Sequence, residues 1–127
     1  MDLLDSKIYS MIGEEGFARL VSAFYQRIPS DDILGPMYRQ HDADLSGAQD
    51  RLRMFLIQRF GGPMTYSEKR GHPRLRMRHA PFQVDRRARD RWMELMEAAL
   101  GEMEFETEVD QALRAFFHDA ATFLINR

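Results

Sequence analysis

Four histidines, His41, His72, His79 and His118, are the residues of this chain best suited to bind a metal or move a proton. No two of them have the i, i+4 spacing of a helical zinc site, and the sequence holds no H-E-x-x-H motif. The chain has no cysteine, which excludes disulfides, thiolate zinc sites, iron–sulfur clusters and cysteine nucleophiles. Any metal must therefore be held by imidazole or carboxylate groups.

His79 differs from the other histidines in its neighbours. If residues 75–79 are helical, His79 shares a face with Leu75, and Phe82 follows one turn later. No acidic partner for the imidazole is obvious nearby in the sequence. A single neutral imidazole facing a flat apolar surface is what an iron porphyrin needs as its protein ligand. His79 is therefore a candidate iron ligand, and a hydrogen-bonded core histidine is the alternative.

Amphipathic helices are the elements that must position such a site. Apolar residues recur at spacings of three and four from Gly16 to Ile28, from Leu45 to Leu56, from Ala88 to Ala99 and from Val109 to Leu124. We find no period-2 strand, internal repeat or low-complexity tract. The sequence therefore predicts an all-α fold with four main helices and an irregular middle.

Local signals predict the ends of these helices. Pro29 is expected to stop the first, Gly61-Gly62-Pro63 the second and Gly101 the third. Asp85 is expected to cap the start of the third helix, and Thr107 to open a capping box for the fourth. Proline ends a helix because it lacks an N–H group, glycine because it readily takes a left-handed conformation, and a capping side chain completes the hydrogen bonding of the first turn.

Two regions between the helices are expected to be irregular. Ser30-Asp31-Asp32 is expected to cap a short turn over residues 33–38, where Gly35-Pro36 leaves no room for a long helix. The stretch from Gly61 to Asp85 is much longer than the roughly 2 to 8 residues that link helices in a bundle. Long connections of this kind are usually functional.

Composition places the chain among ordinary globular proteins, with one domain expected over residues 1–127. The net charge of −2 combines 18 basic and 20 acidic residues, which argues against nucleic acid as a partner. Basic residues nevertheless gather between Lys69 and Arg91. Without a signal peptide or an apolar run long enough to span a membrane, a soluble, cytoplasmic protein is expected.

A series of short motifs fills the irregular middle of the chain. They are Gly61-Gly62-Pro63, Thr65-Tyr66-Ser67-Glu68, Arg70-Gly71-His72-Pro73 and Leu75-Arg76-Met77-Arg78-His79-Ala80-Pro81-Phe82, with Trp92 after them and Phe24-Tyr25 and Arg51-Leu52-Arg53-Met54-Phe55-Leu56 before them. Together these motifs resemble the group II truncated haemoglobins, over roughly Ile12 to Asn126. The resemblance implies a truncated globin, a two-on-two helical sandwich around haem b (iron protoporphyrin IX).

The resemblance also implies roles for individual residues. His79 would be the proximal iron ligand through one ring nitrogen, while the other donates to a backbone carbonyl. Residues of the ligand pocket would be Phe24, Tyr25, Tyr38, Ala48, Leu52 and Trp92. The indole N–H and the phenol groups are donors that stabilise a bound diatomic ligand. Without the resemblance, Trp92 and the two tyrosines would be interpreted as core residues.

Ala48 and three residues with polar side chains complete the implied site. Ala48 aligns with the position where many globins carry a distal histidine, so the donors must be Trp92 and the tyrosines, and the small side chain is expected to leave ligands a path into the pocket. Arg51, Tyr66 and Arg70 resemble family residues near the haem propionates, which Arg binds well. The remaining arginines are interpreted as a solvated face, with a docking patch for an acidic reductase as the alternative.

Three functions follow as hypotheses. The first is a haem protein that binds dioxygen and related diatomic ligands such as nitric oxide or carbon monoxide, with slow oxygen release. The second is a nitric oxide dioxygenase, or a peroxidase-like enzyme acting on peroxide, which needs an external reductase because no G-x-G-x-x-G motif occurs. The third is a cofactor-free helical interaction domain, which leaves His79 and the long connection unexplained.

Overall fold

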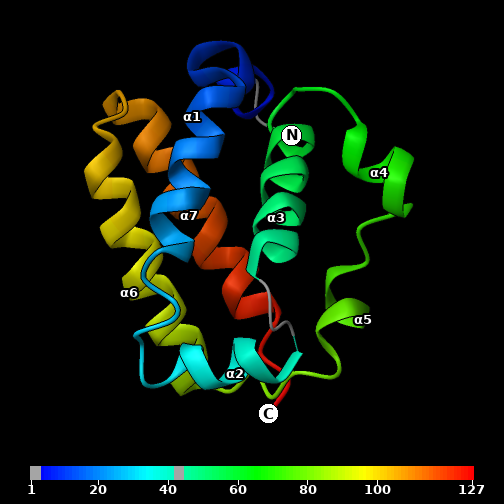
Figure 1. Ribbon diagram of the computed structural model, residues 1–127. Coiled ribbons are helices and arrows are strands. Elements are labelled where there is room, and N and C mark those ends of the chain that lie inside the picture. Colours follow the sequence, from blue (N-terminus) through cyan, green and yellow to red (C-terminus); the bar gives the residue numbers. More distant parts are fainter. Residues whose placement is uncertain (1–3, 42–44) are drawn as a thin grey trace.

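The computed structural model describes residues 4–41 and 45–127, and its regular elements there are helices only (Figure 1). They are η1 (Asp5–Lys7), α1 (Ile8–Tyr25), α2 (Leu34–His41), α3 (Leu45–Arg59), α4 (Thr65–Arg70), α5 (Leu75–His79), α6 (Arg86–Met103) and α7 (Thr107–Phe123). The all-α prediction is confirmed. None of the helices in these two ranges is long and apolar enough to cross a membrane.

The four longest helices form the frame of the molecule. Helix α1 packs against α3 and α6, and α6 packs against α7. Figure 1 shows α2 running across one end of this frame, while α4 and α5 descend along the open side of α3. The short elements α2 and α5 therefore face the space between the long helices from different directions.

The apolar stripe of α1 forms the centre of the core. Phe17, Leu20 and Phe24 have no exposed surface, as predicted from their spacing. The helix begins earlier than predicted, at Ile8, and Gly13 inside it has non-helical angles (φ 68°, ψ 179°) that kink the helix. It also ends at Tyr25, earlier than the stop predicted at Pro29, and Ile28 is buried from the turn that follows.

Helix α2 corrects the prediction of a short turn over residues 33–38. Asp31 acts as the predicted cap, and its Oδ2 accepts hydrogen bonds from the backbone N–H groups of Ile33 (3.0 Å) and Leu34 (2.7 Å). Pro36 lies in the first turn, where backbone N–H groups lack helical partners anyway, so its ring does not stop the helix. The helix therefore continues for eight residues.

The ends of α6 and α7 give one confirmed cap and two corrections. Asp85 caps α6, with its Oδ1 accepting from the N–H of Ala88 at 2.8 Å. The prediction that α6 ends at Gly101 is wrong, since the helix runs to Met103 and ends where Glu104 takes a left-handed conformation (φ 55°). The capping box at Thr107 is also wrong, because Glu106 is the N-cap residue and makes no side-chain cap bond.

The predicted irregular middle contains two short helices and several tight turns. Gly61 (φ 100°) follows α3, and a Cβ atom there would lie 2.0 Å from the carbonyl oxygen of Ser6. Only glycine fits this close approach of the N-terminal segment. The same contact is secured by a 2.9 Å hydrogen bond from the N–H of Tyr9 to the carbonyl of Phe60. The Gly-Gly-Pro motif therefore joins the end of α3 to the start of α1.

Candidate functional site

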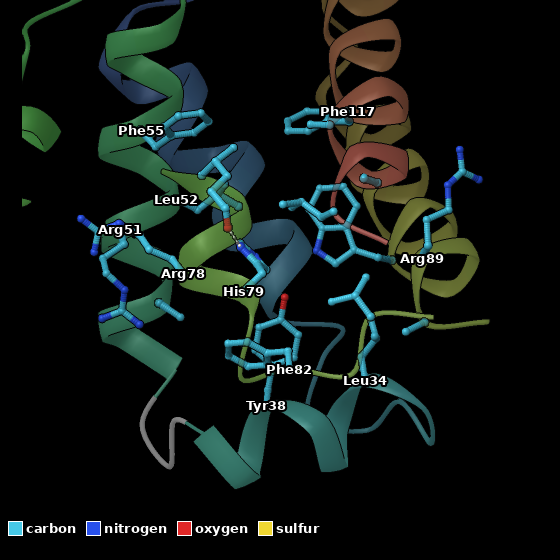
Figure 2. A pocket seen from close by; sticks show the side chains of 18 of the residues that line it. Leu34, Tyr38, Arg51, Leu52, Phe55, Arg78, His79, Phe82, Arg89 and Phe117 are labelled. Carbon is cyan, nitrogen blue, oxygen red and sulfur yellow. Dashed lines mark hydrogen bonds between the residues drawn. The ribbon is translucent and has the colours of Figure 1, made fainter. Parts of the chain in front are cut away.

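A cavity of about 360 Å³ lies between the helices (Figure 2). Nine of the ten residues predicted for the site line it, namely Tyr25, Tyr38, Ala48, Arg51, Leu52, Tyr66, Arg70, His79 and Trp92. The tenth, Phe24, lies behind the wall, where its ring packs 5.0 Å from Trp92 and 5.1 Å from Tyr25. The fold thus brings together predicted side chains from six helices, α1 to α6.

His79 projects from the last residue of α5. Its Nδ1 atom lies 2.7 Å from the backbone carbonyl oxygen of Leu75, and Figure 2 shows this bond running back toward the helix. Because a carbonyl can only accept, Nδ1 carries the proton and Nε2 keeps a free lone pair. The half-buried ring also packs near Phe82, with 5.8 Å between ring centroids. His79 is therefore set in the tautomer that a metal ligand requires.

Tyr38, Trp92 and Tyr25 form a hydrogen-bonded group in the pocket. Tyr38 rises from α2 toward the pocket (Figure 2), and its hydroxyl is hydrogen-bonded to the side chains of Trp92 and Tyr25. Burial raises the pKa of Tyr38 above its usual value, and these two hydrogen bonds act against that shift. An indole can only donate, so the oxygen of Tyr38 accepts from Trp92. The tyrosine rings meet edge to face at 5.9 Å.

Basic side chains lie on two sides of the pocket. Figure 2 shows Arg51 and Arg78 on one side and Arg89 on the other. Arg78 is held in place by hydrogen bonds from its Nε to the carbonyl of Pro73 (2.7 Å) and from its Nη2 to the carbonyl of Arg70 (2.7 Å). Positive charge therefore stands beside an otherwise apolar cavity.

Part of this lining is not predicted from the sequence. Arg78 and Arg89, which are expected on a solvated face, both line the cavity. The only sequence signal for Arg78 is its position next to His79. Several apolar side chains were also missed as pocket residues, namely Leu34, Met37, Phe55, Val84, Ala88, Phe116, Phe117, Ala120, Ala121 and Leu124. Helical spacing predicts that many of these face inward, but not which of them border an open space.

His72 and His118 do not line the cavity. His72 is exposed, and its Nδ1 accepts from the backbone N–H of Arg74 at 3.2 Å. His118 is exposed on α7, 3.9 Å from a carboxylate oxygen of Asp119. The side chain of His41 lies outside the described residues. Within the described ranges, no group of three or more His, Cys, Asp or Glu residues could hold a metal ion.

The arrangement can accept a flat apolar molecule with a metal at its centre and anionic groups at its edge. The imidazole lone pair of His79 would meet the metal, the apolar walls would cover the faces, and the arginines would meet the anions. The residues present therefore fit a porphyrin. These features define the class as helical proteins that enclose a metal-centred cofactor.

Comparisons with known proteins assign the chain to a family within this class. The bacterial-like globin family matches residues 7–126. Group 2 truncated hemoglobin YjbI of Bacillus subtilis (strain 168) is 34% identical over 119 residues, which cover 94% of this chain and 88% of that protein. Two-on-two hemoglobin-3 of Arabidopsis thaliana is 33% identical over 128 residues, covering 95% of this chain and 70% of that protein.

Solved structures agree with this assignment. A hemoglobin from the thermophilic phototrophic bacterium Chloroflexus aurantiacus has a TM-score of 0.88 at 46% identity, covering 94% of this chain and 98% of that chain. A truncated oxygen-avid haemoglobin from Bacillus subtilis has a TM-score of 0.87 at 35% identity, covering 93% and 98%. The chain belongs to the bacterial-like globin family, and the resemblance to group II truncated haemoglobins is confirmed. Its fold is that of a truncated globin, and its haemoglobin relatives imply a haem cofactor and haem-based ligand binding.

Proposed function

We propose that this protein binds dioxygen and other diatomic ligands at a haem iron held by His79. The observation that carries the proposal is the 2.7 Å contact between Nδ1 of His79 and the carbonyl of Leu75, which leaves Nε2 available inside the pocket. Haem, when bound, supplies an iron centre at which small diatomic molecules bind. The chain has no cysteine for thioether attachment, which excludes a c-type haem, and the haem that we propose is non-covalently bound haem b.

Basic and phenolic side chains would hold the two propionates of the haem. Arg51 and Arg70 line the cavity together with the buried Tyr66. Arg78 adds a further charge, and its guanidinium lies 5.9 Å from the ring centroid of Tyr66. Arginine forks match carboxylates in geometry and charge, which supports propionate binding at this side of the pocket.

The other side of the pocket would stabilise the bound ligand. The oxygen of Tyr38 accepts a hydrogen bond from Trp92. In the arrangement that we propose it also accepts from Tyr25, which leaves the O–H proton of Tyr38 to donate to a ligand. A donor held in this way stabilises a ligand that carries partial negative charge and slows its release. Slow release suits sensing or chemistry better than bulk oxygen delivery.

The same donors favour a second function, oxidation of nitric oxide to nitrate by dioxygen or turnover of peroxide. Phenol and indole donors beside the reacting atoms can polarise an O–O bond. Dioxygenation of nitric oxide to nitrate consumes one electron per turnover, and an external reductase would supply it. Nitric oxide consumption in the presence and absence of a reductase, measured at steady state, separates catalysis from simple binding.

Absorption spectra of the ferric, ferrous and oxygen-exposed protein test the proposal. We expect a Soret band that is lost or strongly altered in His79→Gly and restored by free imidazole. His118→Gly is the matched control, because His118 is exposed on α7 and does not line the cavity. A purified protein that shows no Soret band after haem is added would favour the cofactor-free interaction domain instead.

A further inference from the structure

Helix α5, which carries His79, has little to hold it in place by itself. It is five residues long, it has no side-chain cap, and the residue before it, Arg74, is left-handed (φ 43°). An isolated helix of this length is not stable in water. The backbone position of His79 must therefore be set by contacts with other parts of the chain.

Asn126 makes such contacts from beyond the end of α7. Its Nδ2 donates to the carbonyl of His79 (3.3 Å) and to the carbonyl of Phe82 (3.1 Å). Its Oδ1 accepts from the N–H of Val84 at 3.0 Å. Its own backbone N–H donates to the carbonyl of Val84 at 2.8 Å. One residue thus joins the chain after α7 to the segment from His79 to Val84.

The chemistry of this contact is specific to an amide side chain. Asn126 supplies two donors and an acceptor, and its partners are two carbonyl groups and one N–H group. An aspartate of the same shape would turn a carboxylate oxygen toward two carbonyl oxygens, which repel it. The ring of His79 is therefore held by Leu75, and its carbonyl accepts from the Asn126 side chain as well as from the N–H of Phe82 (2.9 Å).

We propose that Asn126 is a positioning residue for His79, and that it sets the strain and strength of the bond between this imidazole and iron. The inference rests on the proposed function, since it requires His79 to be the iron ligand. Partners that orient a metal ligand commonly change metal affinity by about 10- to 100-fold when they are removed. Asn126 belongs to the cofactor site although it does not line the cavity.

Asn126→Asp tests the proposal, with Asn126→Ala as a second variant in case the introduced charge disturbs folding. Gln111→Glu is the matched control, because it makes the same amide-to-carboxylate change at an exposed position of α7. In the haem-free protein, we expect Asn126→Asp to speed amide hydrogen exchange over residues 75–85 and Gln111→Glu to leave it unchanged. In the haem-loaded ferrous protein, we expect a shifted iron–histidine stretching band and roughly tenfold faster haem loss.

The outcomes separate this inference from the function on which it rests. A wild-type protein that shows no iron–histidine band would overturn both. A wild-type protein with such a band, together with an Asn126→Asp variant that has the same band and the same rate of haem loss, would overturn the inference alone. The inference would be overturned even if hydrogen exchange or thermal stability changed in Asn126→Asp. Such a change by itself would show only that Asn126 stabilises the fold.

Discussion

At the scale of single residues, the surroundings of Tyr38 shift the pKa of its hydroxyl. Burial raises its pKa above the usual value, because a phenolate would lose its hydration, and the hydrogen bonds from Trp92 and Tyr25 only partly offset this. The hydroxyl is therefore neutral throughout the physiological range. It can therefore donate a hydrogen bond at neutral pH.

The raised pKa of Tyr38 predicts a loss of stability in alkali. Below pH 10 the tyrosine is protonated in both the folded and the unfolded chain, so its contribution to the free energy of unfolding is complete. As the pH rises above 10 the unfolded chain loses this proton first, and the contribution falls until the pH passes the folded pKa. Denaturant unfolding at several pH values from 8 to 11.5 measures this decline. Tyr38→Phe should decline less steeply, and equal slopes would contradict the assignment.

Trp92 also belongs to the residue scale, since it donates to Tyr38 and lines the cavity. Trp92→Phe keeps an aromatic ring beside Phe24 and Phe117 but removes the N–H donor. We expect oxygen to leave about tenfold faster, because Tyr38 loses the hydrogen bond that orients its hydroxyl toward the ligand. Weakening one charge-assisted hydrogen bond to the ligand by about 1.5 kcal/mol corresponds to that factor. Stopped-flow oxygen dissociation measures the rate. An unchanged rate would show that the indole does not support the bound ligand.

At the scale of elements, an ion pair joins α2 to α6. The carboxylate of Asp31, with a side chain only 5% exposed, lies 3.0 Å from the guanidinium of Arg91 and also caps α2. Helix α2 carries Tyr38, and Trp92 follows Arg91 in α6. The pair therefore sets the relative position of the two helices that hold the hydrogen-bonded pocket residues.

Removal of this pair should affect both stability and ligand release. Asp31→Ala removes a cap and a buried partner of Arg91, so we expect the free energy of unfolding to fall by about 1–3 kcal/mol. Arg91 keeps weaker contacts with Asp32 (3.9 Å) and Glu94 (3.8 Å), which limits the cost. A double-mutant cycle with Arg91→Ala should give a coupling of about 1 kcal/mol. Additive effects in the cycle, with oxygen release as in wild type, would contradict this role.

At the scale of the whole molecule, the cavity is a part of the core that side chains leave open. Its walls include residues of all four long helices, α1, α3, α6 and α7, so a bound cofactor would complete the packing between them. A cofactor that binds only the folded chain stabilises it by mass action. Stability and cofactor binding are thus coupled through the same apolar walls.

This coupling predicts that haem raises the melting temperature. At a free haem concentration of about 100 times Kd, the stabilisation is about 2.7 kcal/mol, which for a protein of this size corresponds to a rise in Tm of roughly 10 °C. Thermal melts followed by circular dichroism at several haem concentrations measure the shift. His79→Gly should show a smaller shift, which free imidazole should restore. If Tm does not depend on haem concentration, the cavity does not bind haem.

Much of the candidate site could be predicted because its residues lie in short, recognisable motifs. The string around His79 and the Gly-Gly-Pro after α3 are local features, and nine of the ten predicted residues line the cavity. Errors arose where a local signal was overruled. Gly101 stays helical, and Glu104 takes the left-handed conformation that ends α6 instead. Pro36 is tolerated because it lies in the first turn of α2.

The sequence alone determined the helical periodicity, a cap within Ser30-Asp31-Asp32, the capping of α6 by Asp85, and the family, since these depend on periodic spacing and on short motifs along the chain. Only the tertiary structure decided that Asp31 meets Arg91, that Trp92 meets Tyr38, that Phe24 stands behind the wall and that Asn126 holds the segment of His79. The physical reason is that separation along the chain does not limit distance in space. Such contacts depend on how whole helices pack.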